Sequence, residues 1–93
     1  PPRDAEAEII QKESGVAAEV AEDLAKLAEK VRNLKEHGLG EGVSTRLLVY
    51  AAKLIHSGIA PRRACQVGVV WALTDDGEVQ RSLEEVVTSI FDE

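Results

Sequence analysis

Positively charged residues in the middle of the chain form the best candidate for a ligand site. Between residues 43 and 74 the sequence contains no Asp or Glu, although the whole chain has 17, and the same stretch contains Arg46, Lys53, Arg62 and Arg63. A guanidinium group stays charged at physiological pH and pairs bidentately with phosphate oxygens. The stretch therefore predicts a site for a phosphate-bearing anion. Alternatively, these cations pair with acids on other helices and only stabilise the fold, and the charge pattern alone leaves both possibilities open.

Arg46 is the most informative of these cations because of its position. Ser44 is expected to cap a helix that follows it, which places Arg46 in the first helical turn. Free backbone N–H groups at a helix start attract anions, whereas the helix dipole disfavours a cation there by a few tenths of a kcal/mol, up to about 1. Arg62 and Arg63 oppose the same preference at the start of the next predicted helix, and Lys53 shares a face with Arg46 seven residues earlier. A local preference that is broken without visible compensation indicates function.

The other reactive residue types give weaker signals. His37 and His56 have no Cys or acid at ligand spacing, so no metal site is expected. Cys65 lies among apolar neighbours and is expected to be buried and unreactive. Asp75 and Asp76 are interpreted as helix caps, with Glu78 completing a capping box for Asp75. The sequence contains neither a GxxxxGK[ST] phosphate loop nor a Ser/His/Asp arrangement, so the isolated chain is not expected to be an enzyme.

Composition excludes several classes of partner. The chain has 93 residues, a net charge of -6 and a pI near 4.9, which argue against non-specific binding to nucleic acid or to anionic membranes. No apolar run approaches the roughly 20 residues of a membrane span, so membrane insertion is not expected. A single cysteine favours a reducing compartment, and hence a cytoplasmic location. The start at Pro1-Pro2, without Met, is interpreted as the beginning of a fragment that follows a linker.

Hydrophobic periodicity predicts an all-α fold: one domain over residues 1–93, built as a compact bundle of four to five helices. Acids at positions 4, 6 and 8 favour a helix start, but the first helix has few large apolar residues and is expected to be short and peripheral. The fourth helix is apolar almost all round and is expected to be the most buried, with Trp71 in the core. The expected helices span about residues 3–13, 17–36, 45–57, 61–72 and 76–91.

Two local features of this bundle remain open. Gly38, Gly40 and Gly42 fall within five residues and form the best candidate hinge, between the second and third helices. The segment from Val69 to Trp71 is rich in residues that favour strands, so it is either helical or extended.

Three sequence blocks resemble a known family. The run LGEGVSTRLLVYAA at residues 39–52, GIAPRRAC at 58–65 and LTDDGEV at 73–79 are similar, in that order, to the C-terminal lid of the CbbQ/NirQ/NorQ family, a branch of the MoxR group of AAA+ ATPases. In such ATPases the arginine of the G-x-S-x-R motif is the sensor-2 residue, which reaches the γ-phosphate of ATP held by the core domain. The resemblance assigns that role to Arg46 with Ser44 as the helix cap, while Lys53, Arg62 and Arg63 are possible contacts to a neighbouring subunit or partner.

The resemblance also implies a larger machine. ATP with Mg would be held by an AAA+ core, because the Walker motifs, sensor 1 and the arginine fingers are absent from this chain. Family members work as hexameric rings with a partner bearing a von Willebrand factor A domain, and they activate or mature a metalloenzyme such as Rubisco or nitric oxide reductase. The isolated chain is accordingly expected neither to hydrolyse ATP nor to bind it tightly. The competing hypothesis is a stand-alone acidic helical module that binds a basic partner through Glu19, Glu22 and Glu29.

Overall fold

All regular secondary structure that a computed structural model describes in this chain, over residues 2–34 and 42–91, is helical. The elements are α1 (Arg3–Ser14), α2 (Ala18–Arg32), α3 (Thr45–His56), α4 (Pro61–Cys65), η2 (Gln66–Val70), α5 (Trp71–Leu73) and α6 (Gly77–Ile90). The segments α4, η2 and α5 follow one another without a break, so they correspond to the single fourth helix that the sequence predicts. The predicted all-α bundle is confirmed.

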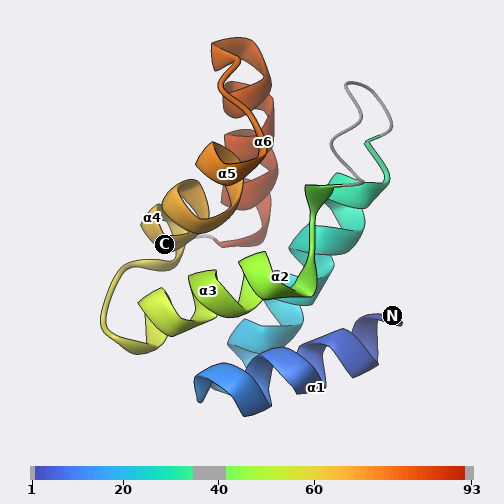
Figure 1. Ribbon diagram of the computed structural model, residues 1–93, viewed down its shortest axis with the longest axis vertical. Helices are drawn as coiled ribbons and strands as arrows, with labels where there is room; N and C mark the ends of the chain where they lie inside the picture. Colours follow the sequence, from blue (N-terminus) through green and yellow to red (C-terminus); the bar gives the residue numbers. More distant parts are fainter. Residues whose placement is uncertain (1, 35–41, 92–93) are drawn as a thin grey trace.

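Helices α1 and α2 form one group, the segments α4 to α6 form a second, and α3 contacts both. Helix α1 packs against both α2 and α3, while α3 also contacts α4 and η2 (Figure 1). Helix α6 packs against α2 and η2, which connects the two groups through the core. None of the helices within the described ranges combines the length and hydrophobicity that a membrane span requires.

The core is built from aliphatic side chains of medium and small size. Leu24, Leu27 and Val31 of α2 are buried as the apolar periodicity predicts, and Leu48 of α3 and Leu83 of α6 meet them. Four alanines are also fully buried, and one of them, Ala51, faces Gly68 of η2: Ala25, Ala28, Ala51 and Ala52. This composition explains how a chain with a 3% share of aromatic residues closes a core.

Helix α1 is more deeply packed than predicted. Ile10 is fully buried, and Glu6 on the same face is only 1% exposed, so the expectation of a peripheral helix is wrong. The helix ends at Gly15, whose φ of 85° is a left-handed conformation that glycine adopts without strain. Its chain reversal allows α2 to start three residues later and to pack against α1.

The segment around Val69 is helical, which excludes the extended alternative. Residues 66–70 adopt a widened π-helical turn, and Val69 and Val70 are buried. A Cβ atom at Gly68 would lie 3.2 Å from the Cβ of Ala51 and 3.2 Å from Cδ2 of Tyr50, so the missing side chain allows η2 to approach α3. The wide turn also carries Trp71 outward: its side chain is 46% exposed, and the prediction that it fills the core is wrong.

Two predicted helix ends shift. Helix α2 ends at Arg32 with Asn33 as its C-cap, four residues before the predicted end. The carboxylate of Asp76, rather than that of Asp75, caps α6 by accepting from the backbone N–H groups of Glu78 and Val79 at 2.9 and 3.1 Å. The interpretation of Asp76 as a cap is confirmed, whereas the capping box built on Asp75 is wrong.

Candidate functional site

Arg46 lies in the first turn of α3, as the sequence predicts. Ser44 adopts an extended backbone conformation, and its Oγ accepts from the backbone N–H of Leu47 at 3.4 Å, so it caps the helix. The Arg46 side chain is exposed, and no residue that the structure describes forms a hydrogen bond or ion pair with it. No acid occurs in this helical turn. The guanidinium is therefore available to an anion that comes from outside the described part of the chain.

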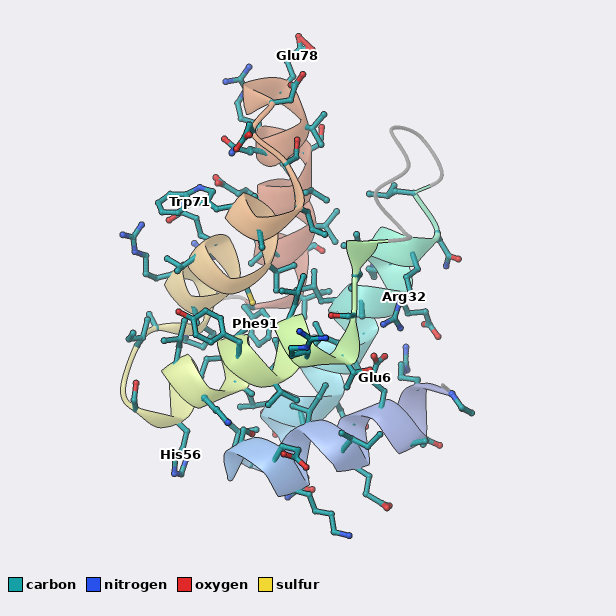
Figure 2. The ribbon with its side chains drawn as sticks, in the orientation of Figure 1. Glu6, Arg32, His56, Trp71, Glu78 and Phe91 are labelled. Atoms are coloured by element: carbon teal, nitrogen blue, oxygen red, sulfur yellow. The ribbon has the colours of Figure 1, made fainter. Side chains whose placement is uncertain are left out.

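A buried ion pair lies directly beneath this turn. Glu6 of α1 and Arg32 of α2 point toward one another (Figure 2), and both guanidinium Nη atoms donate to the two carboxylate oxygens at 2.8 Å. The Glu6 side chain is 1% exposed and the Arg32 side chain 29%. This paired, two-point geometry fixes both side chains and hence the relative position of α1 and α2.

The same ion pair also holds the residues that precede Arg46. The hydroxyl of Thr45 donates to Oε2 of Glu6 at 2.8 Å, and Arg32 donates through Nη2 to the carbonyl oxygen of Val43 at 3.1 Å, with Nε at 3.4 Å. We call Glu6, Arg32, Val43 and Thr45 the Glu6 clamp. It joins the first turn of α1, the end of α2 and the first turn of α3.

The electrostatics of the clamp favour full ionisation. Burial alone would raise the pKa of Glu6, but the hydrogen bonds from Arg32 and Thr45, together with the charge of Arg32, outweigh it and hold the pKa below its ordinary value. The hydrogen bond to Glu6 raises the pKa of Arg32 against the opposing effect of burial. Both shifts favour the charged forms of the two side chains.

The other three cations have different surroundings. Lys53 is exposed in the last turn of α3. The Arg62 Nε donates to the carbonyl oxygen of Phe91 at 2.9 Å, which attaches α4 to the end of α6. Arg63 donates to the amide oxygen of Gln66 at 2.6 Å and stacks 5.1 Å from the centre of the Trp71 ring.

These positions do not converge on one anion site. Arg62 and Arg63 line a shallow cleft with Glu84 of α6, and α4 lies beside the half of α3 that is remote from Thr45 (Figure 1). Lys53 is seven residues from Arg46, roughly 10 Å along a helix axis. Arg46 is thus separated from the other three.

The remaining residues singled out by the sequence are placed as follows. Gly42 lies against α5, where an added Cβ would be 3.0 Å from Cδ2 of Leu73, whereas Gly38, Gly40 and His37 lie outside the described residues. His56 is exposed at the end of α3 (Figure 2), and Cε1 of its ring lies 3.3 Å from the position that a Cβ at Gly15 would take. Cys65 is buried, as predicted. Within residues 2–34 and 42–91, no group of three His, Cys, Asp or Glu side chains is placed to hold a metal ion.

The acidic residues of α2 face solvent. Glu19 and Glu22 are exposed, and Glu29 forms an ion pair with Arg3 at 2.9 Å in which both side chains are about half exposed. An exposed carboxylate is the common arrangement on the outer side of a helix. Glu22 lines a surface cleft between α1 and α2 with Asp4 and Glu8, and Glu29 lines another with Arg3 and Asn33.

Sequence reasoning missed the Glu6 clamp. Local sequence signals mark Glu6 only as an acid that favours a helix start, and they do not single out Arg32 or Thr45. The helical spacing of Glu6, Ile10 and Ser14 places all three on one face, so periodicity carried through the buried Ile10 would have placed Glu6 inside. Its partners could not have been found this way, because they lie 26 and 39 residues away in the sequence.

A family model and several known proteins match most of this chain. A family model described as CbbQ/NirQ/NorQ C-terminal matches residues 6–90. Protein CbbQ of Hydrogenophilus thermoluteolus is 45% identical over 91 residues, which cover 98% of this chain and 34% of that protein. Protein NorQ of Paracoccus denitrificans is 45% identical over 86 residues, covering 92% of this chain and 32% of NorQ.

A third relative extends the same pattern to a regulatory protein. The denitrification regulatory protein NirQ of Pseudomonas aeruginosa is 43% identical over 82 residues, or 88% of this chain and 32% of NirQ. The chain therefore spans about a third of the length of the curated relatives it matches. The resemblance noted in the sequence is confirmed, and the chain belongs to the CbbQ/NirQ/NorQ family, whose C-terminal region it matches.

Proposed function

We propose that this chain is the C-terminal nucleotide-sensing lid of an AAA+ ATPase, in which Arg46 acts as the sensor-2 residue. The observation that carries the proposal is the state of Arg46: exposed, in the first turn of a capped helix, and without a partner among the described residues. An unpaired guanidinium beside free backbone N–H groups suits a phosphoryl group. Family membership supports a longer parent protein, because the matching relatives are about three times as long as this chain.

The residues present fit one part of a bound nucleotide only. Arg46 offers a charged fork for terminal phosphate oxygens, but the chain contains no phosphate loop to hold the rest of the molecule. The nucleotide and its Mg ion would therefore be held by a separate core. Arg46 would add positive charge where the negative charge of the transferring phosphoryl group develops, which is the role of arginine in related phosphoryl-transfer sites.

The mechanical consequence is a movement of the lid. While the terminal phosphate is present, Arg46 holds the lid against the core, and loss of that phosphate releases it. This movement takes place between the lid and the core, because the Glu6 clamp joins α2 to the start of α3. The hinge predicted at Gly38, Gly40 and Gly42 lies between those two helices and stays a prediction, with Gly38 and Gly40 outside the described residues. Lys53 is exposed and stays a proposed contact to a neighbouring subunit, whereas Arg62 and Arg63 also have contacts inside the bundle.

The proposed cellular role rests on the family resemblance and on the name of one relative. NirQ is a denitrification regulatory protein, and CbbQ and NorQ share the same C-terminal region. We propose that the parent protein forms a cytoplasmic hexameric ring, works with a partner that bears a von Willebrand factor A domain, and activates or matures a metalloenzyme of the Rubisco or nitric oxide reductase type.

The decisive experiment is Arg46→Ala in the full-length parent protein. Removing a group that stabilises the transition state should lower kcat for ATP hydrolysis by about 100- to 1,000-fold while the helical circular dichroism is unchanged. Arg81→Ala is the matched control, since Arg81 is also an exposed arginine on a helix and no described residue pairs with it. Wild-type turnover in Arg46→Ala would refute the sensor role.

A further inference from the structure

The Glu6 clamp ends directly at the residue that precedes Arg46. We infer that Glu6 and Arg32 are positioning residues for Arg46, so that α1 and the phosphate-sensing turn of α3 move as one body. This inference rests on the proposed function of Arg46 and adds the means by which the side chain is aimed. Neither Glu6 nor Arg32 is available to touch a nucleotide, since their charged groups are directed at one another.

The contacts restrain two of the three residues before Arg46. Val43 is held through its carbonyl oxygen by Arg32, and Thr45 is held through its hydroxyl by Glu6. Between them, Ser44 accepts the hydrogen bond from Leu47 that starts the helix. The backbone that enters α3 is thus fixed from α1, from α2 and from the helix itself, and the direction of the first turn follows from it.

Nothing in the packing of α3 alone requires this arrangement. Its buried residues Leu48, Ala51 and Ala52 begin one turn further along, so without the clamp the first turn would be held mainly by Ser44 and by the buried side chain of Val43. A buried carboxylate and guanidinium carry a desolvation penalty that an apolar pair would avoid. The clamp provides in return one defined position for the turn that carries Arg46, and a misplacement of about 1 Å at a reacting group can cost about 100-fold in rate.

The Glu6 clamp also links the first turns of two helices that are far apart in sequence. Glu6 is in the first turn of α1, where its backbone N–H donates to the carbonyl oxygen of Pro2 at 2.9 Å, and Thr45 begins α3 39 residues later. A displacement of the start of α1 is therefore transmitted to Arg46 through two hydrogen-bonded side chains. Contact of Arg46 with a phosphate would, in the same way, restrain α1.

The test is a double-mutant cycle in the full-length ATPase. Arg32→Met should lower kcat/KM for ATP hydrolysis by about 10- to 100-fold when Arg46 is present, because Arg46 is no longer aimed. In the Arg46→Ala background the same substitution should change kcat/KM by less than about twofold, because the residue it positions is gone. A purely structural role would produce the same loss in both backgrounds.

Two further variants keep the test decisive if Arg32→Met folds poorly. Thr45→Val removes one hydroxyl donor and keeps the ion pair, and it should show the same dependence on Arg46 with a smaller loss. Arg3→Met is the matched control: the Arg3–Glu29 pair also joins α1 to α2 across 26 residues, but it does not reach α3. Amide hydrogen exchange at residues 44–48 without nucleotide should accelerate in Arg32→Met and Thr45→Val and stay unchanged in Arg3→Met.

The outcomes separate the two proposals. In one outcome, Arg46→Ala lowers turnover, but Arg32→Met and Thr45→Val lower kcat/KM by the same factor with and without Arg46. The positioning inference is then overturned and the sensor proposal stands. If Arg46→Ala retains wild-type turnover, the sensor proposal fails and the positioning inference fails with it.

Discussion

Replacing Arg32 by Met should lower the free energy of unfolding of the isolated chain far more than the substitution of an exposed charged residue does. Met keeps the aliphatic length but donates no hydrogen bond, so the Glu6 carboxylate, 1% exposed, is left with Thr45 as its only donor among the described residues. Breaking a buried pair by removing one partner costs about 3–5 kcal/mol. We expect a value near about 3 kcal/mol, because Arg32 is 29% exposed and water can partly replace it.

The size of this effect is large relative to the stability of the chain. A domain of 93 residues has a free energy of unfolding of roughly 5–14 kcal/mol, so the substitution would remove a fifth to more than half of it. The matched substitution Arg3→Met breaks an ion pair whose side chains are 45% and 52% exposed, and such pairs contribute about 0.2–1 kcal/mol. The double variant Glu6→Leu/Arg32→Met should recover at least half of the loss, because no unpaired charge remains.

Urea unfolding followed by far-UV circular dichroism measures these differences. The midpoint should fall in the order wild type, Arg3→Met, double variant, Arg32→Met, with unchanged m-values. If Arg32→Met lies within about 1 kcal/mol of Arg3→Met, or if the double variant is no more stable than Arg32→Met, the reasoning about a buried, structurally essential pair is refuted.

Three further predictions concern pH, packing and activity. Because the pKa of Glu6 in the folded chain lies below its ordinary value of 4.5, the contribution of Glu6 to stability is present at neutral pH and is lost as the pH falls below about 4.5. The urea midpoint of wild type should therefore drop more steeply over this pH range than that of Glu6→Leu/Arg32→Met. Parallel profiles of the two proteins would contradict this prediction. Gly68→Ala should lower the free energy of unfolding by about 1–3 kcal/mol, because the new Cβ would lie 3.3 Å from the Cα of Ala51. Gly77→Ala, where the new Cβ would have nothing within 4 Å, should be neutral or stabilise the chain by up to about 1 kcal/mol. Equal shifts of the thermal midpoint in the two variants would refute the close approach of η2 and α3. The isolated chain should release no phosphate from ATP above background and should show no saturable nucleotide binding at millimolar ATP in calorimetry; a clear turnover would show that it holds catalytic groups of its own.

The elements of this bundle follow from local signals that act within one or two helical turns. The repeat of Val20, Leu24, Leu27 and Val31 predicts the buried face of α2, and Ser44 and Gly15 mark a helix start and a helix end at the observed places. The exposed position of Trp71 departs from the prediction because the π-helical turn at residues 66–70 changes the angular step between side chains, which a regular 3.6-residue period does not anticipate.

In the candidate site, too, local signals identify one part and miss the part that depends on distant residues. Arg46 could be identified from its own neighbours in sequence, since the cap, the absence of acids and the family motif all lie within a few residues. The Glu6 clamp could not, because a buried ion pair between α1 and α2 depends on the packing of two helices and the return of α3 past both. Single-sequence patterns contain no information about which distant acid meets which distant arginine.

The Arg46 guanidinium is proposed to bind the terminal phosphate of ATP. A structure of the full-length parent protein with Mg and a non-hydrolysable ATP analogue tests it directly. We expect the two terminal nitrogens of Arg46 within about 2.7–2.9 Å of γ-phosphate oxygens, with Glu6, Arg32 and Thr45 in the contacts described above. A nucleotide bound with its γ-phosphate remote from Arg46, or contacted by a different arginine of this region, would contradict the account.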